Sequence, residues 1–144
     1  MTDWRLQPRT MSSDDRERFV QQLESILRSR PEVVFAYLHG TFFEGEPFRD
    51  CDLAIYVTWP PKRELSFRQY ELDLSVELTQ QMRVPVDVRL FNDAPMGFRY
   101  HAFKGRLLFV KDSELLDDVR ARAWDDYFDF APFARRYFSE AIGE

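Results

Sequence analysis

Three aspartates have the residue type and spacing of a site that binds a cation. Asp50 and Asp52 stand at the start of an apolar stretch, and Asp87 lies within a later one. Since alternate residues of a strand share a face, the side chains of Asp50 and Asp52 are expected to project together. Neighbouring carboxylates repel each other unless a cation lies between them, and a hard divalent ion is the natural candidate. The spacing therefore predicts a metal site on this strand.

A glycine and a threonine precede these aspartates and have the character of a phosphate site. Gly40 and Thr41 follow the apolar run 33–38, with only His39 between. Glycine lets the backbone approach a ligand closely, and threonine can cap a following helix, whose first N–H groups attract anions. Gly40 and Thr41 are therefore expected to form half of a phosphate site. A lone histidine at a strand end is more often structural, and Cys51 is expected to pack into the core.

The surrounding segments predict an α/β fold in which a small mixed sheet is flanked by helices. Apolar patterns predict strands over 33–38, 50–57, 86–91 and 106–110, and helices that end near Pro31, span about 66–82 and 94–103, and run from Glu114 onward. If the strand with Asp87 lies beside the strand with the other aspartates, all three carboxylates meet on one face.

Three details of the helices follow from the same patterns. The apolar positions of the helix over 66–82 include Leu72, Val76, Leu78 and Met82. The pair 92–93, Asn-Asp, is expected to cap the helix over 94–103, and Pro132 is expected to kink or restart the last helix.

Length and composition indicate a single domain over residues 1–144, with a core at about 31–111 and a C-terminal helical segment at about 112–144. A net charge of -5 and a pI near 5.1 do not favour a track for nucleic acid, so direct nucleic-acid binding is not expected. A single cysteine excludes an internal disulfide. With no apolar signal core and no run of membrane length, a cytoplasmic protein without membrane contact is expected.

Together, Gly40-Thr41, eight intervening residues, Asp50-x-Asp52 and the later Asp87 resemble the signature of the DNA polymerase β-type nucleotidyltransferase superfamily. Within that superfamily the sequence is most similar to the small MNT-domain (minimal nucleotidyltransferase) proteins, particularly the MntA-like antitoxins paired with HEPN-family toxins. The similarity extends over the stretch 98–109 and the aromatic C-terminal helix around 126–129.

The resemblance implies a polymerase β-type fold and a role for each motif residue. Gly40 and Thr41 would hold triphosphate oxygens, and Asp50 and Asp52 would bind two Mg²⁺ ions. Asp87 would bind one of these ions and help deprotonate the attacking hydroxyl. The implied reaction moves AMP from ATP onto a hydroxyl, expected to be that of tyrosine, of a partner HEPN-type toxin, which the antitoxin thereby silences.

Two alternatives remain open from the sequence. The chain could transfer a nucleotide to a small hydroxylated molecule, or it could be a catalytically degenerate module that neutralises a partner by contact alone. Phe43 and Glu44 favour the second alternative, because an acidic residue near phosphates is unfavourable. A docking surface is also predicted in the aromatic C-terminus, which cannot all be core: Trp124, Tyr127, Phe128, Phe130, Phe133, Tyr137 and Phe138.

Overall fold

The computed structural model describes residues 9–40, 42, 47–58 and 66–141, and for residues 131 and 133–141 it describes the backbone alone. Thr41, Phe43 and Glu44 lie outside the described residues. The elements in chain order are α1 (Ser13–Arg28), β1 (Val33–His39), β2 (Cys51–Val57), α3 (Phe67–Met82), β3 (Val86–Leu90), η2 (Phe91–Asp93), α4 (Met96–Ala102), β4 (Arg106–Val110) and α5 (Ser113–Ala141).

The four strands form one mixed sheet, as the sequence predicts. Their order is β3-β2-β1-β4. β1 pairs antiparallel with both β2 and β4, whereas β2 and β3 are parallel and are joined by the crossover helix α3. The parallel pair places the start of β2 beside the start of β3, which is where the aspartates lie.

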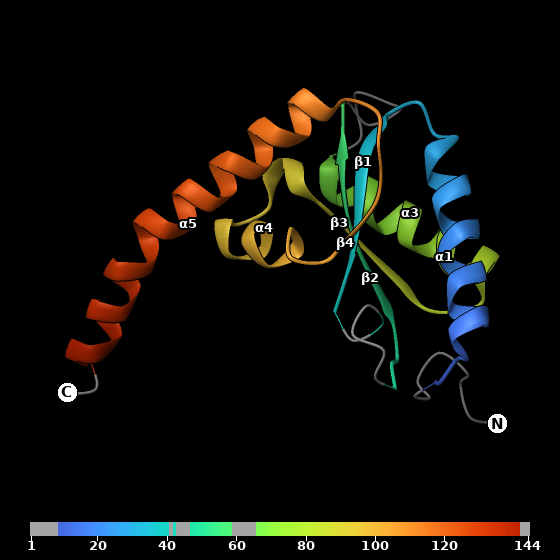
Figure 1. Cartoon of the computed structure of the whole chain (residues 1–144), viewed down its shortest axis with the longest axis horizontal. Coiled ribbons are helices and arrows are strands. Elements are labelled where there is room, and N and C mark those ends of the chain that lie inside the picture. The colour runs from blue at the N-terminus through green and yellow to red at the C-terminus, as the bar shows by residue number, and fades with distance from the viewer. Residues whose placement is uncertain (1–8, 41, 43–46, 59–65, 142–144) are drawn as a thin grey trace.

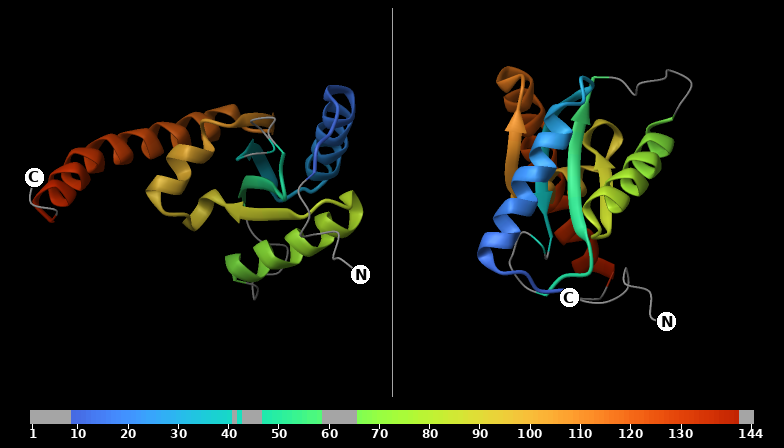
Figure 2. Two further views of the ribbon diagram at one scale, coloured as in Figure 1. Left: turned by 90° about the horizontal axis from the view of Figure 1, so that it is seen from below. Right: turned by 90° about the vertical axis from the view of Figure 1, so that its right-hand side faces the viewer.

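Helices cover both faces of the sheet. α1 and α3 lie on one face, and α4 and the first half of α5 lie on the other (Figures 1 and 2). Buried residues form two clusters that correspond to these two layers. The second half of α5 extends beyond the sheet, as Figure 1 shows. Within the described ranges, no helix combines the length and apolarity needed to cross a membrane.

Serine caps fix the starts of the two helices on the first face. The Ser12 side chain accepts a hydrogen bond from the N–H of Asp15 at 3.1 Å, and the Ser66 side chain accepts one from the N–H of Gln69 at 3.1 Å. Each bond satisfies an N–H group that the first turn of the helix leaves without a partner. The cap at Ser66 agrees with the helix predicted over about 66–82.

The buried face of α3 differs from the apolar positions chosen from the sequence. Leu78 and Met82 are buried as part of a stripe with Tyr70 and Leu74, but the side chains of Leu72 and Val76 are 51% and 58% exposed. Because the stripe repeats every four residues, Leu72 and Val76 lie on the opposite side of the helix. Two apolar side chains of α3 therefore face outward, one helical turn apart.

One expectation for the second half of the chain is wrong, and of the kink or restart expected at Pro132, the restart does not occur. The Asn92 side chain does not cap α4. It accepts a hydrogen bond from the N–H of Val57 at 3.1 Å and donates one to the carbonyl of Val57 at 2.7 Å, which closes the end of β2. The last helix does not restart at Pro132, since α5 is a single helix that includes this proline.

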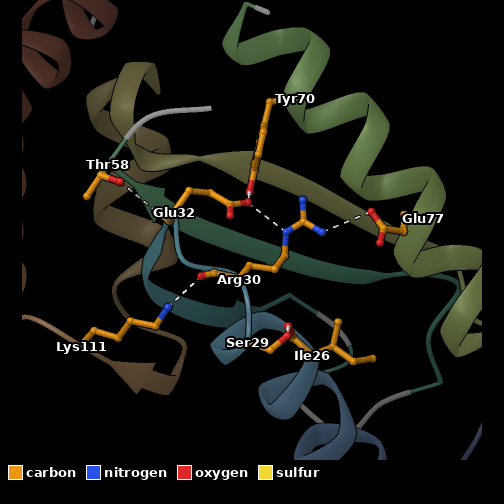
Figure 3. A network of polar contacts seen from close by, with 8 residues as sticks. All are labelled: Ile26, Ser29, Arg30, Glu32, Thr58, Tyr70, Glu77 and Lys111. Atoms are coloured by element: carbon orange, nitrogen blue, oxygen red, sulfur yellow. Dashed lines mark hydrogen bonds and ion pairs between the residues drawn. The ribbon is translucent and has the colours of Figure 1, made fainter. Parts of the chain in front are cut away.

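A polar network joins the turn between α1 and β1 to α3 and β4 (Figure 3). Glu32 accepts hydrogen bonds from the Tyr70 hydroxyl at 2.6 Å and from Arg30 Nε at 3.0 Å. Lys111 Nζ donates to the carbonyl of Arg30 at 2.8 Å. Although partial burial would raise the pKa of Glu32, these hydrogen bonds lower it. The network fixes the end of the sheet opposite the aspartates.

Side chains of α3 close the outer edge of β3. The N–H groups of Val86, Val88 and Leu90 point away from β2 and donate to Thr79 Oγ1, Ser75 Oγ and Glu71 Oε2 at 2.9, 2.9 and 2.8 Å. An edge strand with free N–H groups would be a template for pairing with another chain. Here these N–H groups already have acceptors, so the edge is not open to a further strand.

This edge gives a first testable expectation. The substitution Ser75→Ala removes the acceptor of the Val88 N–H and is expected to lower the free energy of unfolding by about 1–2 kcal/mol. Ser25→Ala, at an exposed position of α1, is the matched control and is expected to change it by no more than about 0.5 kcal/mol. Urea unfolding of both variants measures the difference, and equal effects would contradict the role given to Ser75.

Candidate active site

The sheet brings the predicted aspartates together. Asp52 of β2 lies directly opposite Asp87 of β3 in a parallel register, so both side chains project from the same face. Asp50 immediately precedes β2, and Cys51 between them is fully buried on the other face, as predicted. The neighbour relation that the sequence left conditional is thus present, and it places all three carboxylates at one end of the sheet.

The pKa values of Asp52 and Asp87 show that the carboxylates are partly buried and repel one another. Burial raises the pKa of Asp52 to about 6, and the charges of Asp50 and Asp87 add to this rise. The pKa of Asp87 is also raised, by partial burial and by Asp50, against the opposing effect of Arg89. Negative charge is therefore concentrated between the starts of β2 and β3, where a bound cation would relieve the repulsion.

Gly40 permits the backbone to pass close to Asp52. Its φ is 80°, and a Cβ at this position would lie 2.4 Å from Asp52 Oδ2. No side chain fits there without moving the carboxylate, and a positive φ is itself strained for residues other than glycine. The prediction that Gly40 serves close approach is consistent with this geometry. Thr41, the other predicted phosphate residue, is not among the described residues.

Two phenylalanines anchor the loop that carries Gly40 and Asp50. The rings of Phe42 and Phe48 are 4.7 Å apart and almost perpendicular, and Phe42 also packs on Phe19 of α1 at 4.9 Å. The Arg16 guanidinium lies over the Phe42 ring at 4.8 Å and donates to the Phe42 carbonyl. Both rings are buried, so the two ends of the loop are fixed against α1.

On the face of the sheet covered by α4, the ring of Phe98 contacts two residues that neighbour the aspartates. Phe98 lies between two groups, with the His39 ring 5.4 Å from its centroid and the Arg89 guanidinium 4.9 Å from it. His39 is the cross-strand partner of Asp52, and its Nε2 atom is buried with no hydrogen-bond partner among the described residues. Burial and the charge of Arg89 lower the pKa of His39, which favours a neutral imidazole.

The residues fit a divalent cation in chemistry, although their positions are not those of a preformed metal cage. Within the described part of the chain, no three His, Cys, Asp or Glu side chains are already grouped at metal-binding distances. The donor set nevertheless consists of carboxylate oxygens, which Mg²⁺ prefers. Asp50, Asp52 and Asp87 are therefore the residues that would hold such an ion.

Sequence reasoning missed Arg89 and Phe98 as members of the site. Arg89 follows Asp87 by two residues on the same strand, so its side chain shares the face of the aspartates. That spacing was the available signal. Nothing in the sequence placed Phe98 beside them, because α4 reaches the sheet only through the tertiary fold.

The raised pKa of Asp52 gives a pH-dependent expectation for stability without added divalent cations. An Asp whose pKa rises from 3.8 to about 6 on folding binds more protons in the native state between these values. Stability contributed by the protonated form is therefore lost as the pH rises from about 4 to about 6. The substitution Asp52→Asn removes this pH-dependent loss of stability, because asparagine does not titrate.

We expect Asp52→Asn to raise the free energy of unfolding above pH 7 by about 1–2 kcal/mol, a value discounted because solvent screens part of the carboxylate. Near pH 4 the gain is expected to disappear. Urea unfolding in EDTA over this pH range tests the expectation, and a gain that is constant with pH would contradict the burial and repulsion assigned to Asp52.

The predicted aromatic surface on α5 is present in part. The side chains of Trp124, Phe128 and Phe130 are 41%, 58% and 51% exposed. Tyr127 instead stacks on Tyr100 of α4, with ring centroids 3.7 Å apart. The side chains of Phe133, Tyr137 and Phe138 lie outside the description.

The chain matches one family of known proteins by sequence. The sequence model of the family "Polymerase beta, Nucleotidyltransferase" matches residues 21–114, which include Gly40 and the three aspartates. No curated protein matches the chain by sequence.

Several solved structures have a similar fold. A chain from a complex of a tri-AMPylated Shewanella oneidensis HEPN toxin with MNT antitoxin has a TM-score of 0.69 at 13% identity, over 88% of this chain and 98% of that chain. A toxin–antitoxin structure with AMP-PNP gives a TM-score of 0.70 at 15% identity, over 85% of this chain and 98% of that chain. An MntA–HepT toxin–antitoxin structure gives a TM-score of 0.68 at 13% identity, over 88% of this chain and 98% of that chain.

At such low identity these structures establish the fold alone. The family match is independent of them and covers more than half of the chain, from within α1 to the start of α5. The chain belongs to the polymerase beta nucleotidyltransferase family.

Proposed function

We propose that the chain is a Mg²⁺-dependent adenylyltransferase that moves AMP from ATP onto a tyrosine hydroxyl of a HEPN-type toxin and acts as its antitoxin. The observation that carries this proposal is the in-register pair Asp52 and Asp87, with Asp50 beside them and Gly40 against Asp52. A site for in-line transfer at a phosphate needs such a cluster of hard ligands next to a close-approaching backbone.

Each residue is given a role that its position permits. We assign Asp50 and Asp52 to the binding of Mg²⁺, expected as two ions, and Asp87 to one of these ions and to the acceptor hydroxyl. Gly40 and Thr41 are assigned to the triphosphate of ATP. Mg²⁺, when bound, neutralises charge that develops on the attacking and leaving oxygens.

The proposed step is an in-line displacement. The acceptor oxygen attacks the α-phosphorus of ATP, and the bond from that phosphorus to the bridging oxygen breaks as the new bond forms. Pyrophosphate leaves with the bonding electron pair, and the hydroxyl proton passes to Asp87. A carboxylate whose pKa is raised is a better proton acceptor than an ordinary aspartate, which suits Asp87 to this role.

The proposed partner follows from two observations. MNT antitoxin in a similar structure forms a complex with a HEPN toxin that carries AMP. In the present chain, α5 exposes Trp124, Phe128 and Phe130 along a helix that extends beyond the sheet (Figure 1), and aromatic side chains are enriched at protein interfaces. We place the pair in the cytoplasm, where the single buried cysteine would stay reduced.

Calorimetry distinguishes this proposal from a module that acts by contact alone. The native chain is expected to bind ATP when Mg²⁺ is present and to lose most of that affinity in EDTA. A pure binding module would bind its partner but show no metal-dependent affinity for ATP, and that result would overturn the proposed activity.

A further inference from the structure

We propose that a hollow at the outer edge of β3, continued by a groove along α3, receives the acceptor side chain and the segment of the partner that carries it. This inference rests on the proposed function and adds to it the direction from which the acceptor reaches Asp87. The hollow lies at the β3 edge of the sheet, and the groove continues along α3, which covers the face away from α5.

The hollow opens beside Asp87. Its volume is about 430 Å³, and its lining includes Asp87 and Arg89 of β3, Arg68 and Leu72 of α3, and Pro95 before α4. Ligand pockets in proteins typically range from about 300 to 1,000 Å³, so the space is sufficient for a side chain that carries a ring. The hollow is thus lined in part by Asp87, the carboxylate to which the acceptor proton is assigned.

The charges of the lining favour a neutral group. Two arginines, Arg68 and Arg89, face three carboxylates, those of Glu71, Asp87 and Asp93, which gives a net charge of -1. Arg89 is also engaged by Glu71 at 3.9 Å, and Glu71 holds the N–H of Leu90. In the absence of a metal ion this balance does not attract the negative charge of a triphosphate, whereas an uncharged aromatic hydroxyl is unaffected by it. The hollow therefore suits the acceptor better than the nucleotide.

The edge of β3 excludes an added strand as the occupant. The outward N–H groups of Val86, Val88 and Leu90 already donate to side chains of α3. A partner segment cannot pair with this edge through its backbone without breaking these bonds. It must instead insert a side chain into the hollow while its backbone stays outside.

An apolar strip leads away from the hollow along α3. Leu72 lines the hollow, and Val76, one turn further along, lines a second hollow of about 340 Å³ with Ser75, Thr79 and Gln80. Ser75 borders both hollows, so the two lie next to each other along α3, and we refer to them together as the groove. The side chains of Leu72 and Val76 are 51% and 58% exposed and belong to neither buried cluster of the described residues. They would be covered by residues that flank the acceptor.

The test compares one double variant with one single variant in the transfer of AMP to a HEPN-type toxin, the proposed partner. The variant Leu72→Ser with Val76→Ser is expected to raise the KM for that protein at least about tenfold, as loss of apolar contacts at an interface does. Leu107→Ser is the control, because this exposed leucine lies on β4 at the opposite edge of the sheet. Both variants change exposed side chains and are expected to keep the native affinity for ATP with Mg²⁺.

A photo-crosslinking residue at position 72 gives a second measurement. It is expected to join the partner peptide that also carries AMP, whereas the same residue at position 107 is not. An unchanged KM in the Leu72 and Val76 variant, or a crosslink from 107 in place of 72, would overturn the groove while leaving the transfer reaction intact. If the native chain transfers no AMP at all, the proposed function itself fails.

Discussion

The double variant Asp50→Asn with Asp52→Asn is expected to reduce AMP transfer at least about 1,000-fold while the chain remains folded. Asparagine keeps the shape of each side chain but removes the charge that would hold a cation. Because burial, and after it the charges of Asp50 and Asp87, raise the pKa of Asp52, replacing these carboxylates removes an unfavourable charge from the chain without a cation. Transfer of labelled AMP and circular dichroism measure the two effects.

The control for this variant is Asp112→Asn, at the other end of the sheet. Asp112 caps α5 by accepting the N–H of Leu115 at 3.1 Å, a bond that asparagine can also accept. It is expected to transfer AMP at the native rate. Retained transfer in the double variant would refute the assignment of Asp50 and Asp52, and loss of transfer together with unfolding would contradict the claim that these residues serve the site and not the fold.

Gly40→Ala is expected to reduce transfer by about 100-fold or more with only a moderate loss of stability. The new Cβ would lie 2.4 Å from Asp52 Oδ2, so the carboxylate must rotate away. A displacement of this size at a reacting centre can cost about 100-fold in rate. The positive φ of 80° adds a strain of about 1–2 kcal/mol for alanine. Single-turnover transfer and urea unfolding separate the two effects.

Gly97→Ala is the matched control for Gly40→Ala. A Cβ at Gly97 meets no atom within 4 Å, and Gly97 lies within α4, where alanine is the better helix former. The variant is expected to be slightly more stable and fully active. Similar losses of transfer in both variants would indicate that the face of α4, rather than the contact between Gly40 and Asp52, limits the reaction.

The core of the site was predictable because it depends on short-range rules. The spacing of Asp50 and Asp52 sets their common side, and the apolar strand that follows them fixes their place in the sheet. The sequence left the neighbour relation of β2 and β3 conditional, and the structure supplies the parallel register that puts Asp87 opposite Asp52. Serine caps and the strand pattern likewise located most of the elements.

The remaining features depend on tertiary contacts that no local pattern specifies. Leu72 and Val76 look like core residues by type, yet the stripe from Tyr70 to Met82 buries the other face of α3. Asn92 looks like a helix cap, but the end of β2 provides two better partners. The approach of Phe98 to His39 and Arg89 arises only when α4 folds against the sheet. The groove along α3 was invisible for the same reason.

The most direct test of the proposed transfer is the mass of the HEPN protein co-expressed with this chain. The proposal predicts that its mass increases by one or more whole AMP units, on a tyrosine, and that the increase disappears when Asp50 and Asp52 are replaced by asparagine. A complex in which the HEPN protein is neutralised but keeps its unmodified mass would contradict it.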